Sequence, residues 1–245
     1  MSTIALAAVI VAAVAGRPQL PAAVRANQCA ECHLQVVWTR SELTHTDEWV
    51  TSKHARYGVG CDKCHGGDAA TTDRPAAHRG VTAAGDPSSP VHWMQLPATC
   101  GGCHAAEGNA FARSIHSELL RQGDAMVPTC TTCHSSMSAD VPSALDVERR
   151  CASCHPPDRD DRARRARRDL DEIAGLQKLL RRARLEVAAI ADARRQQELA
   201  AERDELDVAI RAAVAATHGF DRSRVDARLG EARAVAEHLA RAFAR

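Results

Sequence analysis

The chain has 245 residues and a formal net charge of +1, and aromatic residues make up only 3% of it. Because the charge is close to neutral, electrostatics gives no reason to expect nucleic acid or an anionic membrane as a partner. With so few aromatic side chains, a soluble core of this length would lack large apolar groups unless bound apolar groups supply them.

The chain begins with a run of small and apolar residues at positions 3–15. The run has the length of the apolar region of a signal peptide and is too short for a comfortable bilayer span. Ala13 and Ala15 give a plausible cleavage site, but no lysine or arginine precedes the run. Residues 1–16 are therefore expected to be a signal peptide, with an uncleaved short membrane anchor as the alternative.

All ten cysteines belong to Cys-x-x-Cys-His motifs, the attachment signature of c-type haem. On one helical turn, thiols at positions i and i+3 lie on the same face and can add to the two vinyl groups of a single porphyrin. The histidine that follows is then held beneath the ring, where it ligates the iron. The motifs predict five covalently attached haem c groups, and their residues are Cys29, Cys32 and His33; Cys61, Cys64 and His65; Cys100, Cys103 and His104; Cys130, Cys133 and His134; Cys151, Cys154 and His155.

Zinc ribbons and disulfides also use paired cysteines, and both are less favoured here. Zinc ribbons consume cysteine pairs in twos, whereas this chain has five pairs. Tetrahedral zinc also has no need of a histidine directly after every second cysteine. A disulfide within one motif would be strained and would connect no distant parts of the chain.

Residues 27–157 are expected to form a haem-packed, mainly α-helical pentahaem domain with few or no strands. The motifs occupy the 127 residues from Cys29 to His155, so short helices and loops should wrap the haems. A weak internal repeat suggests duplicated haem modules. One Ser-x-His sequence, ending at His54, precedes the second motif, and another, ending at His116, precedes the fourth.

Seven histidines lie outside the motifs, enough to give each of five irons a second axial ligand. His54 and His116 are the first candidates because of their repeated setting. His78 and His92 follow, although the first could be an exposed loop residue and the second could pack on the neighbouring tryptophan. His218 could reach back over a haem and tie the C-terminal region to it, or could simply favour a helix C-terminus.

His45 is a reserve candidate, and His238, on the last predicted helix, is expected to be a surface residue. Methionine ligation would raise the potential of a haem relative to bis-histidine ligation. Most methionines serve packing, so we do not predict such a ligand among the methionines of the haem region, which are Met94, Met126 and Met137.

Composition changes sharply near residue 157: the chain after this point has no proline or cysteine and is rich in Ala, Arg, Leu and Glu. Apolar residues at three- and four-residue steps predict one long amphipathic helix, weakened near its middle and ending at His218 and Gly219. A second helix, capped by Asp221 or Ser223, should run to the chain end. Residues 158–245 are thus expected to form a long antiparallel helical hairpin that docks, oligomerises or braces the haems.

Six arginines lie between positions 159 and 168, at the start of this C-terminal region. We expect them to face water or to pair with nearby aspartates. Docking of haem propionates or of an acidic partner is the alternative.

Two stretches of the motif region carry a resemblance to known proteins. Residues 49–54 (WVTSKH) lead to residues 61–68 (CDKCHGGD), and residues 97–104 (PATCGGCH) precede residues 111–116 (FARSIH). They resemble the haem modules of the multihaem cytochromes c of the nitrification and nitrite-reduction group. That group includes small tetrahaem electron carriers, pentahaem nitrite reductase and octahaem hydroxylamine oxidoreductase. The resemblance, over residues 29–155, implies haem attachment and no particular substrate.

The chain departs from the enzymes of that group at the residues that carry their chemistry. Pentahaem nitrite reductases place a lysine where the proximal histidine of the catalytic haem would be, whereas all five motifs here end in histidine. The enzymes also rely on tyrosine at the catalytic haem, and this chain has a single tyrosine, Tyr57. Their enzymatic functions are therefore not transferred.

The sequence thus favours a periplasmic or otherwise extracytoplasmic electron-transfer cytochrome, because haem is attached to such chains after export. Six-coordinate irons, mostly with two histidines, would relay electrons between unidentified redox partners. A membrane quinol-oxidising complex or another multihaem cytochrome is a candidate partner, and a homo-oligomer through the C-terminal helices is a further expectation. The alternative is a reductase or oxidase of a small nitrogen or sulfur oxyanion, with one open haem site.

Overall fold

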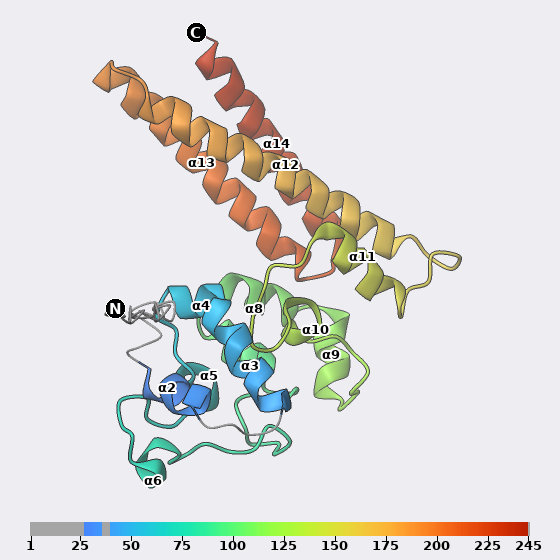
Figure 1. The fold of residues 1–245 in the computed structure, drawn as a ribbon. Helices are drawn as coiled ribbons and strands as arrows, with labels where there is room; N and C mark the ends of the chain where they lie inside the picture. The colour runs from blue at the N-terminus through green and yellow to red at the C-terminus, as the bar shows by residue number, and fades with distance from the viewer. Residues whose placement is uncertain (1–26, 36–39, 245) are drawn as a thin grey trace, which may run out of the picture.

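The computed structural model describes residues 27–35 and 40–244, and this part of the chain is helical or irregular, without a strand (Figure 1). The expected mainly α-helical fold is confirmed. The predicted signal peptide or anchor, residues 1–16, lies outside the described residues. None of the described helices combines the length and apolar composition needed to cross a bilayer. In chain order the helices are α2 (Gln28–Gln35), α3 (Arg40–Thr51), α4 (Lys53–Arg56), α5 (Asp62–His65), α6 (Arg74–Ala77), α7 (Leu96–Gly101), α8 (Ala105–Phe111), α9 (Ile115–Arg121), α10 (Cys130–His134), α11 (Ala144–Ala152), α12 (Arg162–Ala188), α13 (Ala193–Thr217) and α14 (Arg222–Phe243).

The haem segment, residues 27–157, holds the short helices α2 to α11 and a small protein core. Ala30, Trp49 and Ala55 are buried together, with Met137 packed against them. The Trp49 indole N–H donates a hydrogen bond to the Val59 carbonyl (3.1 Å), which ties α3 to the loop before the second motif. This cluster is small, as expected if bound apolar groups complete the core of the segment.

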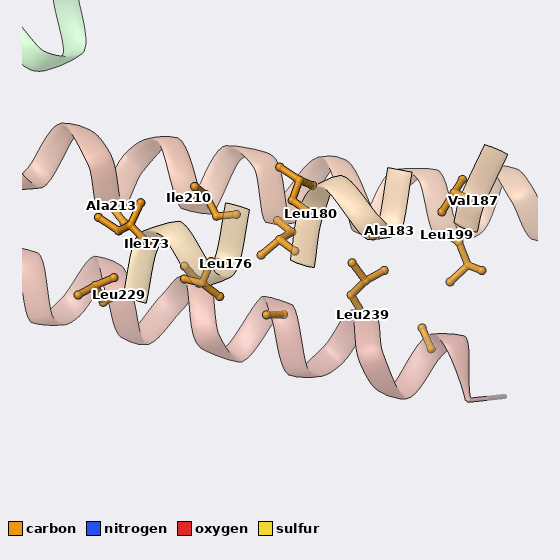
Figure 2. Packing of buried hydrophobic residues seen from close by; sticks show 14 of the residues in the cluster. Ile173, Leu176, Leu180, Ala183, Val187, Leu199, Ile210, Ala213, Leu229 and Leu239 are labelled. Atoms are coloured by element: carbon orange, nitrogen blue, oxygen red, sulfur yellow. The ribbon is translucent and has the colours of Figure 1, made fainter. Parts of the chain in front are cut away.

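The tail bundle, formed by α12, α13 and α14, has a continuous apolar core (Figure 2). The apolar stripe of each helix faces the other two, as the three- and four-residue spacing predicts. Burial of each such leucine or isoleucine stabilises the fold by about 1.5–3 kcal/mol. The larger members are Ile173, Leu176, Leu180, Leu199, Leu206, Ile210, Leu229 and Leu239.

The tail contains three helices, whereas the sequence predicts a hairpin of two. The first predicted helix is interrupted at residues 189–192, where Ala189 forms the C-cap of α12. The Asp192 carboxylate then accepts a hydrogen bond from the Arg195 N–H (2.7 Å) and caps α13. This cap gives the Arg195 N–H a hydrogen-bond acceptor, which in a continuous helix would be a backbone carbonyl. The chain can therefore leave α12 and reverse direction before α13 begins. Successive helices run antiparallel (Figure 1).

The turn between α13 and α14 lies where the sequence predicts it, but its backbone differs from the expectation. Phe220, rather than Gly219, adopts the left-handed conformation, with φ of 53°. Gly219 lies against α8, where a Cβ would be in van der Waals contact with the Ala110 carbonyl oxygen at 3.4 Å. Asp221 caps α14 by accepting from the Arg224 N–H (3.3 Å). The turn therefore rests directly on the haem segment.

The tail bundle lies along one side of the haem segment, with α12 against α11 and α13 against α8 (Figure 1). Arginines at the start of α12 form ion pairs with neighbouring carboxylates, as expected. Arg165 pairs with Asp161 (2.9 Å), and Arg167 pairs with Asp171 (3.5 Å) and with Glu148 of α11 (2.8 Å). The last pair crosses between the two parts of the molecule.

Leu206→Ala is expected to destabilise the tail bundle by about 2–5 kcal/mol, because the side chain is fully buried and its removal leaves a cavity. Val208→Ala, on the same helix and 59% exposed, is the matched control and should change stability by about 0.5 kcal/mol or less. Denaturant unfolding followed by far-UV circular dichroism measures both. Equal losses for the two variants would contradict the packing of α13 described above.

Candidate haem-binding sites

The ten motif thiols, all within the described residues, are unpaired, so none forms a disulfide. Each motif forms a helical turn, which places its two thiols on one face, as haem attachment requires. The first motif lies in α2 and the fourth forms α10. In the other three, the histidine N–H donates to the carbonyl of the first cysteine: His65 to Cys61 (2.8 Å), His104 to Cys100 (2.9 Å) and His155 to Cys151 (2.8 Å).

Thiols of the third and fourth motifs are neighbours. Interaction with Cys130 raises the pKa of Cys100, and interaction with Cys100 lowers the pKa of Cys130. Groups bonded to these two sulfurs would therefore be immediate neighbours.

The other consecutive motifs also adjoin. Burial and then the charge of Cys29 raise the pKa of the Cys61 thiol to about 11. The pKa of Cys64 is raised mainly by burial and then by the interaction with Cys100. The pKa of Cys151, from the fifth motif, is likewise raised mainly by burial and then by the interaction with Cys133. Because charges interact this way only at short range, each motif has a thiol near a thiol of the next motif in the chain.

Four motif histidines each lie beside a histidine from elsewhere in the chain. Two imidazoles on opposite sides of one metal, each at a bond of about 2 Å, have ring centres about 6 Å apart. The observed separations fit this arrangement, so the residues present suit an iron between each pair. The pairs and their ring-centre separations are His33 and His78 (6.1 Å), His104 and His54 (6.1 Å), His155 and His116 (6.3 Å), and His134 and His218 (6.1 Å).

Hydrogen bonds orient several of these rings for ligation. The Nδ1–H of His78 donates to the Arg74 carbonyl (2.9 Å), that of His134 to the Asp140 carbonyl (2.9 Å), and that of His218 to the Val214 carbonyl (3.0 Å). His155 Nδ1 lies 3.4 Å from the Asp160 carboxylate. Metal-binding histidines use such partners to fix the tautomer, which leaves Nε2 free for the metal.

The repeated Ser-x-His sequence has a structural basis. Ser52 caps α4 by accepting from the Ala55 N–H (3.1 Å), and Ser114 caps α9 by accepting from the Ser117 N–H (3.1 Å). In each case the histidine is the second residue of the short helix, so the cap fixes its direction. Both modules thereby present a histidine to a motif histidine that follows much later in the chain.

Two glycines bring His78 to the first motif. Gly66 and Gly67, which follow the second motif, have φ of 76° and 84°, a conformation that L side chains rarely adopt. A Cβ on Gly67 would lie 2.4 Å from the Ala77 carbonyl, which accepts a hydrogen bond from the Asp68 N–H (3.0 Å). The loop that carries His78 therefore packs directly on this pair, a contact that the sequence analysis missed.

The tail contributes two side chains to the histidine pairs. His218, at the end of α13, is stacked on His134 with an interplanar angle of 6°. Phe220 meets His116 edge to face, with ring centres 4.6 Å apart. The aromatic contact holds the His116 ring against the tail turn. Phe220 carries no sequence signal that would have identified this role.

The remaining candidates are placed differently. His92 is buried, its ring lies 5.4 Å from that of Trp93, and its Nδ1 accepts from the Met94 N–H (3.4 Å). The structure therefore does not bring His92 to a motif histidine. Among the described side chains, no histidine from outside the motifs pairs with His65, whose pKa is lowered by His33 of the first motif, and the His45 side chain is outside them. His238, as expected, is a surface residue and pairs with Glu202.

Burial lowers the pKa of four histidines, and nearby groups lower it further. The second contribution comes from His104 for His54, from His33 for His65 and from His155 for His116. For His218 burial again dominates, with His134 acting in the same direction and the Val214 carbonyl opposing it. A lowered pKa favours the neutral imidazole, which is the form that binds a metal.

Comparisons with known proteins agree with this chemistry. The Cytochrome c554 and c-prime family matches residues 11–66, which include the first two motifs. The chain is similar to the C-type polyheme cytochrome OmcC of Geobacter sulfurreducens, with 28% identity over 117 residues, or 45% of this chain and 14% of that protein. It is also similar to the C-type polyheme cytochrome OmcB of the same species, with 29% identity over 123 residues, or 46% of this chain and 14% of that protein. No solved structure matches the chain significantly.

The matched segment is thus less than half of this chain and a small fraction of each relative. The relatives are polyheme cytochromes by name, and the five motifs of this chain supply the thiols and histidines for repeated haem attachment. The chain is therefore a multihaem c-type cytochrome.

Proposed function

We propose that the chain is an exported pentahaem cytochrome that relays electrons between redox proteins and has no catalytic site of its own. The observation that carries the proposal is the set of four histidine pairs with ring centres 6.1–6.3 Å apart, beside motif thiols that adjoin in chain order. Haem supplies the reversible one-electron chemistry. The protein supplies the axial ligands, the burial and the spacing.

In this proposal each haem is bonded to the two cysteines of one motif and held by that motif's histidine. Four second ligands follow from the ring pairs: His78 for the first haem, His54 for the third, His218 for the fourth and His116 for the fifth. Two histidines would hold the iron of each of these haems and leave no place for a substrate, so the haems would exchange electrons without binding one.

The proposed path for electrons follows the sequence, from the first motif to the fifth. It rests on the neighbouring thiols of consecutive motifs, above all Cys100 and Cys130, which shift each other's pKa. Electrons would enter or leave at the two ends of this row. Unidentified redox proteins, such as a membrane quinol-oxidising complex or another multihaem cytochrome, would then meet the protein at the first and fifth haems.

A second candidate function is reduction or oxidation of a small nitrogen or sulfur oxyanion at one open haem. The observation that favours it is the second motif, because among the described side chains no histidine from outside the motifs pairs with His65, and the imidazole that lowers its pKa is His33 of the first motif. The enzymes that the chain resembles use a tyrosine at such a site, and Tyr57 is exposed. We therefore rank this function below electron relay, with His45 as the proposed second ligand of the second haem.

Electron paramagnetic resonance of the mature, fully oxidised protein separates the two functions. Electron relay predicts five low-spin haems and an absorption spectrum that carbon monoxide does not change in the reduced protein. A high-spin signal from one haem, together with carbon monoxide or nitrite binding, would establish the open site instead. Mass spectrometry of the same sample counts the haems, and fewer than five would overturn the pentahaem proposal.

Gly67→Ala is expected to displace the His78 loop and turn the first haem from low spin to high spin. The added Cβ would meet the Ala77 carbonyl at 2.4 Å, on a backbone already at φ of 84°. Gly85→Ala, where nothing lies within 4 Å, is the control and should keep the wild-type spectrum. Electron paramagnetic resonance of both proteins measures the difference, and unchanged spectra for Gly67→Ala would remove His78 from the first haem.

We assign the chain to the periplasm or another extracytoplasmic compartment, because haem attachment of this type follows export. In this proposal residues 1–16 direct export, residues 27–157 form the pentahaem domain and residues 158–245 brace it. The exposed faces of the tail bundle could also pair two copies of the chain. Sedimentation of the mature protein tests this, because a dimer would have twice the mass that mass spectrometry gives for one chain.

A further inference from the structure

A cavity of about 820 Å³ lies between the haem segment and the tail bundle. Cys103 and His104 of the third motif line one side, and α12 and α13 line the other. Cavities of roughly 300–1,000 Å³ are the size that holds small ligands and cofactors. Because the thiol of Cys103 borders the cavity, a group bonded to that thiol would border it too.

The wall from the tail combines an apolar floor with a positive rim. Leu180 and Ile210 belong both to this wall and to the core of the tail bundle. The rim carries Arg181, Arg184 and Arg211. Such a wall suits a flat apolar ring that carries acidic groups at its edge.

The charges of the rim are not balanced within the cavity. Asp207 pairs with Arg184 (3.1 Å) and with Arg211 (3.4 Å), so one carboxylate serves two guanidinium groups. Among the described residues, no carboxylate lies within ion-pair distance of Arg181. Glu107, at the first turn of α8, is the other acidic residue of the lining. Three guanidinium groups therefore face two carboxylates.

We propose that this cavity receives the propionate edge of the third haem and that Arg181 and Arg184 bind the propionate carboxylates. The inference rests on the proposed function, since it takes a haem bonded to Cys100 and Cys103 as given. It assigns the tail a task beyond supplying His218: α12 sets the charge around the third haem. Arginine suits this task because its planar fork matches a carboxylate and always stays charged.

The double variant Arg181→Gln and Arg184→Gln tests the inference. Loss of two positive charges beside the propionates should lower the midpoint potential of one haem and leave the other four unchanged. It should also make that potential depend more strongly on pH, because the propionates then protonate more readily. Potentiometric titration of the holoprotein, followed by absorption and electron paramagnetic resonance, measures both effects.

Arg182→Gln is the matched control, because Arg182 lies on the same helix, does not line the cavity and pairs with Glu186 (2.6 Å). If the double variant and this control titrate like the wild type with five haems attached, the inference is wrong while the electron relay stands. A shift seen only with added inorganic phosphate would assign the cavity to a solvent anion and also overturn it. A wild-type protein without haem on the third motif would overturn the proposed function itself.

Discussion

Replacing His218 with alanine is expected to leave five haems attached but to turn one of them from low spin to high spin. Attachment needs only the local motif, whereas in the proposed ligand set the second ligand of the fourth haem would be His218, whose ring is stacked 6.1 Å from His134. The open iron should then bind carbon monoxide when reduced. Mass spectrometry counts the haems, and electron paramagnetic resonance with carbon monoxide titration measures the spin change.

The control for this experiment is His238→Ala in the same tail bundle. His238 is exposed and lies 3.7 Å from Glu202, so its loss should leave the spectrum unchanged. Far-UV circular dichroism of both variants checks that the helices persist. If His218→Ala keeps every haem low spin while the helices are intact, His218 is not a ligand and the tail only packs against the haem segment.

Removing the central haem with Cys100→Ala and Cys103→Ala is expected to change the midpoint potentials of two of the four remaining haems. Neighbouring haems shift each other's potentials through their charges, and the third motif adjoins both the second and the fourth. Redox titration followed by electron paramagnetic resonance resolves the individual haems. Mass spectrometry should give four haems for this protein.

Cys151→Ala with Cys154→Ala removes the fifth haem instead and serves as the comparison. The fifth motif adjoins the fourth alone in the proposed row, so a single remaining haem should change its potential. If removal of the third haem changes one neighbour or removal of the fifth changes two, the haems do not follow the order of the motifs. Loss of all haems from either protein would show that attachment is not independent from motif to motif.

The parts of the site that could be predicted from the sequence are those set by local geometry. The motif turns follow from spacing alone, and the Ser-x-His repeat marks His54 and His116 because each serine caps a short helix. Asp192 directly before Ala193 is a capping signal of the same kind, and it marks the start of α13. The apolar stripe is weak near the end of α12 and the start of α13, so the spacing of apolar residues did not reveal that two helices meet there.

The parts that could not be predicted depend on tertiary packing. His92 and His78 both lie in loops between the second and third motifs, yet the first packs on Trp93 and the second reaches His33. The difference comes from the close approach of the His78 loop to Gly67, which no local pattern encodes. The spatial order of the motifs likewise appears only when their thiols are seen together.

One arrangement bears on how the protein is made. Three of the four histidine pairs can form once the chain has been synthesised as far as His155, because both members lie in the haem segment. The pair of His134 and His218 can form only after the last quarter of the polypeptide is present and α13 has folded. In the proposed ligand set, the fourth haem would thus be the last of these four to gain its second ligand. A chain truncated before His218 by a protease or an early stop codon would still carry all its haems. Its absorption spectrum would nevertheless differ from that of the full-length protein, because the fourth haem would lack its second ligand.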